Sequence, residues 1–343
     1  MACRFLDGFE IYSAAGGLTT QKDLLCRWQN GGAGIVTGRN GNGLQMGSLG
    51  KTIDHQNNWT VGFAITYNTW GTGPFGSPYQ LCHAGSVLCG LYGNVDSTLS
   101  LFAGGTQSPT YQIGTTSRAL HENEWYFMEV SVQLSGTNPI SVTGEVRVNG
   151  QTVIGPATTV SEKNQSDLLL QTTTCNYHIF STLGSANTTI DDLYIFDGNG
   201  TFNNTFAGDN KIECLLPNSD YSVSWTPTGG GSSFSQLDEI TPDYDTTYCS
   251  SNTVSSSDMY GFPNLTTFSG KVIAVQYSVL ARKDAEGLRT IKLLSDSGIP
   301  ASPEMYLGDG YEYYMVQSDS PDGINPWSLA TFNGTHFGYE VFE

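Results

Sequence analysis

Apolar residues at every second position are the pattern that most constrains the fold of this chain. In the first such segment Trp59, Val61 and Phe63 fall on one face, whereas Thr60 and Gly62 fall on the other. Successive side chains of a β-strand point to opposite faces of a sheet, so this spacing predicts strands with one buried face. The segments that show it are 59–67, 125–134, 144–154, 188–196 and 271–281.

The connections between these segments also indicate β structure. Asn149-Gly150 separates two apolar runs, and this dipeptide favours a tight hairpin turn because both residues tolerate positive φ. No stretch shows the helical period over more than a turn or two. We therefore predict an all-β protein of many short strands.

Length and composition agree with two β domains. The chain has 343 residues, and 13% of them are charged, against about 25% in a typical soluble domain. Such a chain has few of the charged residues that helix surfaces require. The Gly/Asn-rich stretch that begins at Asp197 predicts a boundary, with domains at 1–198 and 199–343.

The formal net charge of −18 limits the possible partners. It repels phosphate backbones, so we expect no nucleic-acid binding, and it disfavours anionic membrane surfaces. No run of 18 apolar residues is present, and the first ten residues do not resemble a signal peptide. The seven cysteines are odd in number and widely spaced, which predicts free thiols in a reducing cytosol.

Two adjacent carboxylates, Asp191 and Asp192, are the first candidates for chemistry. Within a regular strand they point to opposite faces, so they are not expected to form an acid/base pair. One of them is predicted to accept backbone N–H groups of a neighbouring loop, because a buried carboxylate needs donors. The sequence does not show which one.

Other motifs of metal or catalytic sites are incomplete. The five histidines are scattered singly, and the calcium-loop pattern that starts at Asp197 has Phe202 and Gly208 where such a loop needs Gly and Glu. We therefore expect no cofactor, no metal site and no catalytic residues.

Aromatic residues supply two candidate binding regions. Trp70, Phe75 and Tyr79 lie in a Gly/Pro-rich loop at 69–79, where they could stack on a sugar or fold back on their own sandwich. Tyr311, Tyr313 and Tyr314 make both faces of one strand apolar, which predicts a subunit interface, with burial inside one sandwich as the alternative.

The order of several segments resembles concanavalin-like or laminin-G-like jelly rolls. These segments are "LDGFEIY", "GRNGNGLQMG", "NNWTVGFAI", "NEWYFMEVSV", "GEVRVNGQTVI" and the final strand "TTIDDLYIFDG". Residues 237–298 and 325–341 are similar to C-terminal halves of tailed-bacteriophage virion proteins. The resemblance implies an all-β chain with an N-terminal jelly-roll sandwich followed by a second, smaller β-sandwich. The paired-glutamate pattern of glycan hydrolases with this fold cannot be matched here.

This resemblance implies a non-enzymatic virion protein, made in the host cytoplasm and attached to the tail as a fibre, collar or baseplate-peripheral component. Its expected partners are other phage virion proteins and further copies of itself, with a host surface glycan as another candidate. Three alternatives remain open: a capsid decoration protein, a glycan-binding host adhesin and a polysaccharide hydrolase.

Overall fold

We describe the protein from a computed structural model. It divides into two compact units, Ala2–Ile212 and Glu213–Glu343, and each is described by itself. The residues that the structure describes are 2–45, 47–67, 76–83, 86–104, 111–117, 119–136, 140–161, 175–181, 188–266, 270–299 and 301–343.

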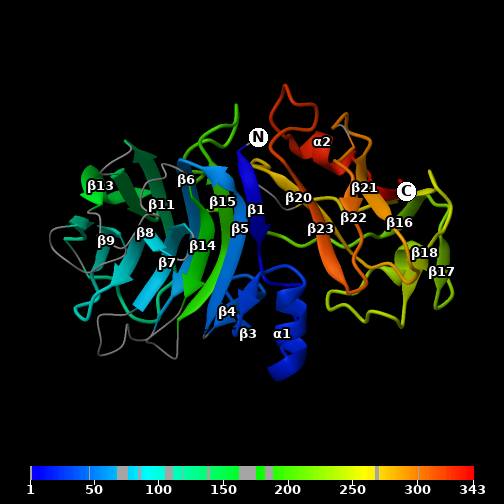
Figure 1. The fold of residues 1–343 in the computed structure, drawn as a ribbon, viewed down its shortest axis with the longest axis horizontal. Helices are drawn as coiled ribbons and strands as arrows, with labels where there is room; N and C mark the ends of the chain where they lie inside the picture. The colour runs from blue at the N-terminus through cyan, green and yellow to red at the C-terminus, as the bar shows by residue number, and fades with distance from the viewer. Residues whose placement is uncertain are drawn as a thin grey trace. The chain divides into compact units, whose positions relative to one another are not determined.

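The first unit contains two antiparallel sheets (Figure 1). The first sheet runs in the order β13 (Gln151–Ser161), β12 (Ile140–Val148), β11 (Tyr126–Ser135), β6 (Asn58–Thr66), β15 (Thr189–Asp197), β4 (Asn42–Gln45) and β3 (Gly34–Thr37), and β1 (Cys3–Asp7) also pairs with β15. The second sheet runs in the order β10 (Gln112–Thr115), β9 (Leu99–Ala103), β8 (Ser86–Gly93), β7 (Gly76–His83), β14 (Cys175–Ser181), β5 (Ser48–Gln56) and β2 (Asn30–Gly31). A short helix, α1 (Gly17–Leu25), precedes β2.

Aromatic side chains fill the space between the two sheets. Phe63 of β6 packs edge-on against Phe180 of β14 at a centroid distance of 6.0 Å, and Trp59 packs edge-on against His178 at 4.5 Å. Side chains at alternate positions along β12 are buried, as a half-buried strand requires. The all-β sandwich predicted from the sequence is therefore confirmed.

The hairpin between β12 and β13 is also confirmed. Asn149 has φ 48° and Gly150 has φ 76°, so both residues of the turn occupy the left-handed region that Asn-Gly favours. The turn brings Val148 opposite Gln151 and sets the register of the two strands.

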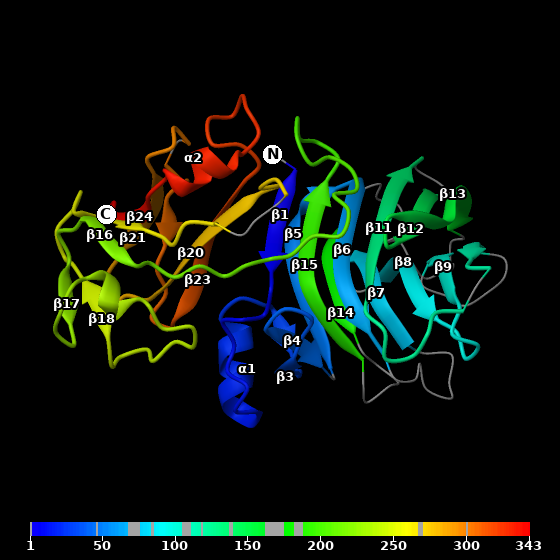
Figure 2. The same ribbon diagram turned by 180° about the vertical axis from the view of Figure 1, so that it is seen from behind.

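The segment after β15, residues 199–212, packs on the first sheet, and we call it the connecting segment. Figure 2 shows the chain after β15 lying against that strand. The Gly208 N–H donates to Glu129 Oε1 at 2.7 Å, and the Ile212 N–H donates to Asp192 Oδ1 at 2.8 Å. The compact unit therefore extends to Ile212, beyond the boundary at 198 that composition alone suggested.

The second unit is smaller and is also built from strands. Its main sheet runs in the order β16 (Ser219–Ser222), β19 (Ser257–Gly261), β24 (Phe337–Val341), β21 (Thr290–Ser295) and β22 (Met305–Tyr306). Two further pairs are β17 (Thr226–Thr228) with β18 (Tyr248–Ser250), and β20 (Val275–Ala281) with β23 (Glu312–Ser318). A 3₁₀ turn, η3 (Phe234–Gln236), and α2 (Leu329–Asn333) complete it. One apolar cluster that includes Tyr277, Leu293 and Trp327 forms its core.

No helix in the described part of the chain is long and apolar enough to cross a membrane. Among the described residues, no disulfide joins the cysteines at positions 3, 26, 82, 89, 214 and 249.

The hydrogen bonds of the connecting segment predict how truncation affects stability. We expect residues 1–212 to fold alone and residues 1–198 to be less stable by about 2 kcal/mol or more, because Glu129 and Asp192 each lose a backbone donor. Urea unfolding of both fragments measures the difference. Equal unfolding free energies would show that the connecting segment contributes nothing to the sandwich.

Candidate functional site

Polar side chains form two rows across the outer face of the first sheet, the face that points away from the second sheet. Gln133 of β11 lies opposite Asn58 of β6 and Thr143 of β12. Ser131 lies opposite Thr60 and Glu145 in the same way. The alternate residues of these strands, such as Trp59 and Val132, are buried in the core. The strand period therefore places every member of the two rows on one face.

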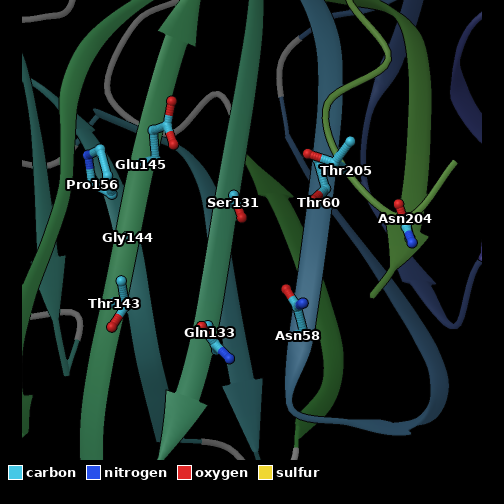
Figure 3. A pocket seen from close by; sticks show the side chains of 10 residues that line it. All are labelled: Asn58, Thr60, Ser131, Gln133, Thr143, Gly144, Glu145, Pro156, Asn204 and Thr205. Carbon is cyan, nitrogen blue, oxygen red and sulfur yellow. The ribbon is translucent and has the colours of Figure 1, made fainter. Parts of the chain in front are cut away.

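The two rows form the floor of a groove of about 210 Å³, which we call the polar groove (Figure 3). Asn204 and Thr205 of the connecting segment lie beside it on the β6 side, and Pro156 of β13 lies beside it near Glu145. Its lining carries amide, hydroxyl and carboxylate groups. Such a surface can donate and accept many hydrogen bonds to a ligand.

An ion pair stands at the end of the groove lined by Glu145. Arg147 Nε donates to Glu145 Oε1 at 2.8 Å, and the Thr152 hydroxyl donates to the same oxygen at 2.8 Å. The Arg147 guanidinium also lies 3.9 Å from the ring centroid of Phe206, a residue of the connecting segment. This arginine is therefore held by two partners.

A buried carboxylate next to the groove holds the connecting segment. Glu129 is 1% exposed, and it accepts from the Tyr194 hydroxyl at 2.5 Å and from the Gly208 N–H. Burial raises the pKa of Tyr194 well above its ordinary value, and the charge of Glu129 adds to this effect. Gly62 is required beneath the Tyr194 ring, since a Cβ there would lie 2.2 Å from a ring carbon.

Asp191 and Asp192 are both buried, but the predicted opposite orientation is wrong. Asp191 Oδ2 accepts from the backbone N–H groups of Arg39 at 2.7 Å and Asn40 at 2.9 Å. Asp192 Oδ2 accepts from the side chains of the same two residues, at 3.0 Å and 2.9 Å. The strand has a bulge here, and Asp192 has φ 51°, so strict alternation fails.

The predicted loop-capping role is confirmed, and both aspartates perform it. Burial raises the pKa of Asp191 to about 6; the backbone N–H of Asn40 opposes this rise, whereas the charge of Asp192 adds to it. Each carboxylate is held by the loop that Arg39 and Asn40 form. We therefore assign both to structure.

Glu10 lies in the same acidic neighbourhood. Burial raises the pKa of its carboxyl to about 8; a hydrogen bond to its own backbone opposes the rise, and the negative charges of Asp191, Asp7 and Asp192 add to it. Gly8 and Gly41 leave room for this carboxyl, because a Cβ at either position would lie within 3.1 Å of one of its oxygens. Glu10 is therefore protonated at neutral pH.

Tyr79 is not available to a ligand, which corrects its predicted role in binding. It is 1% exposed, and its hydroxyl lies 3.0 Å from His178 Nδ1 in the core. Burial lowers the pKa of His178 to about 3, so the ring is neutral. Tyr79 lies within β7 rather than in the predicted loop, and its side chain points into the core. The other two predicted residues, Trp70 and Phe75, lie outside the described residues.

The predicted interface tyrosines occupy different environments. Tyr314 is 9% exposed and belongs to the core of the second unit, which favours burial inside one sandwich for this residue. Tyr313 lies opposite Leu280 and is half-buried. Tyr311 precedes β23, donates its hydroxyl to Asp245 at 2.7 Å and packs under the Arg282 guanidinium. A subunit interface at Tyr311 and Tyr313 stays a prediction.

Asp197, the first residue of the incomplete calcium motif, also has a structural role. Its carboxylate is fully buried and accepts from Arg4 Nε at 2.5 Å and from the Asn199 N–H at 2.8 Å. Across the described ranges no three His, Cys, Asp or Glu side chains are grouped to hold a metal ion.

Comparison with known proteins gives similar folds at low identity. No family model matches the chain, and no curated protein matches it. Among solved structures, alginate lyase Aly36B is 10% identical with a TM-score of 0.39, covering 57% of this chain and 96% of the lyase. The Bacillus subtilis carbohydrate-binding module CBM66 is 11% identical with a TM-score of 0.31, covering 49% and 94%. A Trypanosoma rangeli sialidase is 14% identical with a TM-score of 0.32, covering 48% of this chain and 27% of the sialidase.

These structures correct the prediction that the chain is not an enzyme. An alginate lyase from Aplysia kurodai and an endo-β-1,4-glucuronan lyase from Trichoderma reesei are also similar, so enzymes occur among the neighbours of this fold. At these identities and TM-scores the likeness carries no argument about substrate or activity. The site must be judged from its own residues.

The polar groove was missed in the sequence, although a signal for it was present. Ser131, Gln133, Thr143 and Glu145 occupy the alternate positions of strands that were predicted correctly. Polar residues there are ordinary on a solvated sheet face. Only their register across three strands shows that they converge.

The raised pKa of Glu10 predicts a pH dependence of stability. In the unfolded chain this group ionises near pH 4.5, whereas in the folded chain it stays protonated to about pH 8. Its contribution is therefore fully present below about pH 4.5 and is lost as the pH rises through 8. At pH 9 we expect the unfolding free energy of Glu10→Gln to exceed that of wild type by about 1–2 kcal/mol. This value is reduced to allow for the partial exposure of the group.

The measurement is urea unfolding of both proteins at pH 5 and pH 9. The unfolding free energies of the two proteins should differ little at pH 5, where Glu10 of the folded chain is neutral. Since Asp191 titrates in both proteins, the difference between them isolates Glu10. An identical loss of stability at pH 9 in both proteins would contradict the assignment.

Proposed function

We propose that the first unit binds glycans in the polar groove. The observation that carries this proposal is the pair of polar rows, in which Gln133 and Ser131 each have polar neighbours on both adjacent strands. Sugar hydroxyls both donate and accept, and amide and hydroxyl side chains match both roles. The backbone of three paired strands holds these groups in place before a ligand arrives, which lowers the entropy cost of binding.

The walls of the groove support the same proposal. Asn204 and Thr205 are exposed residues of the connecting segment, and they add an amide and a hydroxyl above the floor. A concave polar surface lets a ligand contact the floor and a wall together. The two polar rows cross three paired strands, so a chain of sugars rather than a single small molecule is the expected ligand.

The role in a phage particle that the sequence predicts stays a proposal beside this one. A tail-attached protein meets the bacterial surface, where glycans are exposed, so a glycan-binding sandwich suits that setting. The resemblance of residues 237–298 and 325–341 to virion proteins supports it. Antibody labelling of purified particles tests this role.

Cleavage of the bound glycan is a second candidate, and Glu145 is the observation that favours it. This carboxylate lies on the groove floor beside the hydroxyls of Ser131 and Thr143. A carboxylate next to a bound sugar can act as a general acid or base.

Binding is tested with Gln133→Ala on a glycan array, followed by calorimetry with a glycan that binds. Gln133 is exposed, so its removal should leave the fold intact and weaken binding by about 1 kcal/mol, or about fivefold. Thr52→Ala is the matched control, because Thr52 is an exposed polar residue on β5 of the other sheet. If both variants weaken glycan binding equally, or if neither weakens it, the site lies elsewhere.

Cleavage is tested with Glu145→Gln on the same glycan. We expect product formation, followed as reducing ends and as unsaturated sugars, to fall at least 100-fold in this variant if Glu145 transfers the proton. Binding of the intact glycan should persist. Equal product formation by wild type and variant would exclude this role for Glu145.

A further inference from the structure

The charge of the groove lining bears on the kind of polysaccharide that the polar groove can bind. Of its described residues, Glu145 is the one that carries a charge, and the others are amides, hydroxyl side chains, Gly144 and Pro156. No lysine or arginine is among them. A sugar carboxylate placed here would meet a negative charge and no positive one.

The adjacent arginine does not give the groove a net positive charge. Arg147 lies on the same strand face, but Glu145 accepts its Nε at 2.8 Å and Phe206 stacks on its guanidinium at 3.9 Å. Because Glu145 accepts from Arg147 Nε, the two charges offset each other and the pair adds no net positive charge to the groove.

Arg4 of β1 and Arg39 of the loop between β3 and β4 are also paired with acids. Arg4 pairs with Asp197 and Asp54, and Arg39 pairs with Asp192 and Asp209. The net charge of −18 adds a long-range repulsion toward any polyanion. The charge of the groove lining and the net charge of the chain therefore both oppose the binding of a polyanion.

We infer that the polar groove selects neutral polysaccharides and excludes polyuronates, with Glu145 as the residue that sets this preference. The inference rests on the proposed glycan binding and specifies its substrate class. A neutral sugar keeps its hydroxyls available to Gln133, Ser131 and Thr143. Glu145 can accept from a sugar hydroxyl, but it repels a sugar that carries a carboxylate.

The test uses the full chain and pairs of oligosaccharides that differ only at C6. Suitable probes are β-1,4-linked glucose and mannose hexamers, together with the corresponding glucuronate and mannuronate hexamers, within an array of other neutral and acidic glycans. Calorimetry at low salt is expected to show binding to a neutral hexamer and at least 10-fold weaker binding to its acidic partner. High salt should reduce that difference by screening the charges.

Glu145→Gln provides the decisive variant, because it removes the negative charge and leaves the positive charge of Arg147 uncompensated. Its affinity for the acidic hexamer should rise about 10-fold relative to wild type. Asp54→Asn is the matched control: it removes the same charge from an exposed pair with Arg4, at 3.2 Å, that does not line the groove. The control should leave the ratio of acidic to neutral affinity within about twofold of wild type.

The outcomes separate the inference from the proposed function. Equal or tighter binding of the acidic hexamers by wild type would overturn the neutral preference while glycan binding stood. An equal change of the affinity ratio in both variants would overturn the role of Glu145. Binding to no glycan of either class would overturn the proposed function and the inference together.

Discussion

Buried carboxylates that accept backbone N–H groups are the interaction on which the first unit depends. A carboxylate removed from water costs several kcal/mol unless donors replace the water, so each one fixes the position of the segment that supplies them. Glu129 and Asp192 hold the connecting segment through Gly208 and Ile212. Asp191 holds the loop of Arg39 and Asn40. The groove wall formed by Asn204 and Thr205 follows from these bonds.

The second unit uses the same device. Asp258 is fully buried and accepts from the N–H groups of Ser224 at 2.6 Å and Trp225 at 2.9 Å. Asp220, which is exposed, also accepts from the backbone N–H groups of Ser233 and Phe234. A chain with few regular helices and many loops leaves many backbone donors unpaired, and short acidic side chains satisfy them. Part of the acidic composition is therefore explained by loop architecture rather than by a ligand.

The groove gains its properties from the same arrangement. Its floor lies on paired strands and one wall lies on a segment that Glu129 holds, so the ligand meets a preformed surface. The charge of the groove lining comes from a different carboxylate, Glu145. Arginine is the usual means of binding a carboxylate, and here Arg4, Arg39 and Arg147 are all paired with the acids of the chain itself.

The sequence by itself determined where the main strands lie and which of their residues face the core, because alternation is a local property of the chain. The strands at 59–67, 125–134 and 144–154, and the turn at Asn149-Gly150, could all be predicted in this way. Only the tertiary structure decided which outward residues meet. The bulge at Asp192 directs the carboxylates of Asp191 and Asp192, which were expected on opposite faces, toward one loop. The pairing of β6, β11 and β12 brings their polar residues into one groove. Register and loop capping depend on donors and acceptors far apart in the chain, and no local pattern records them.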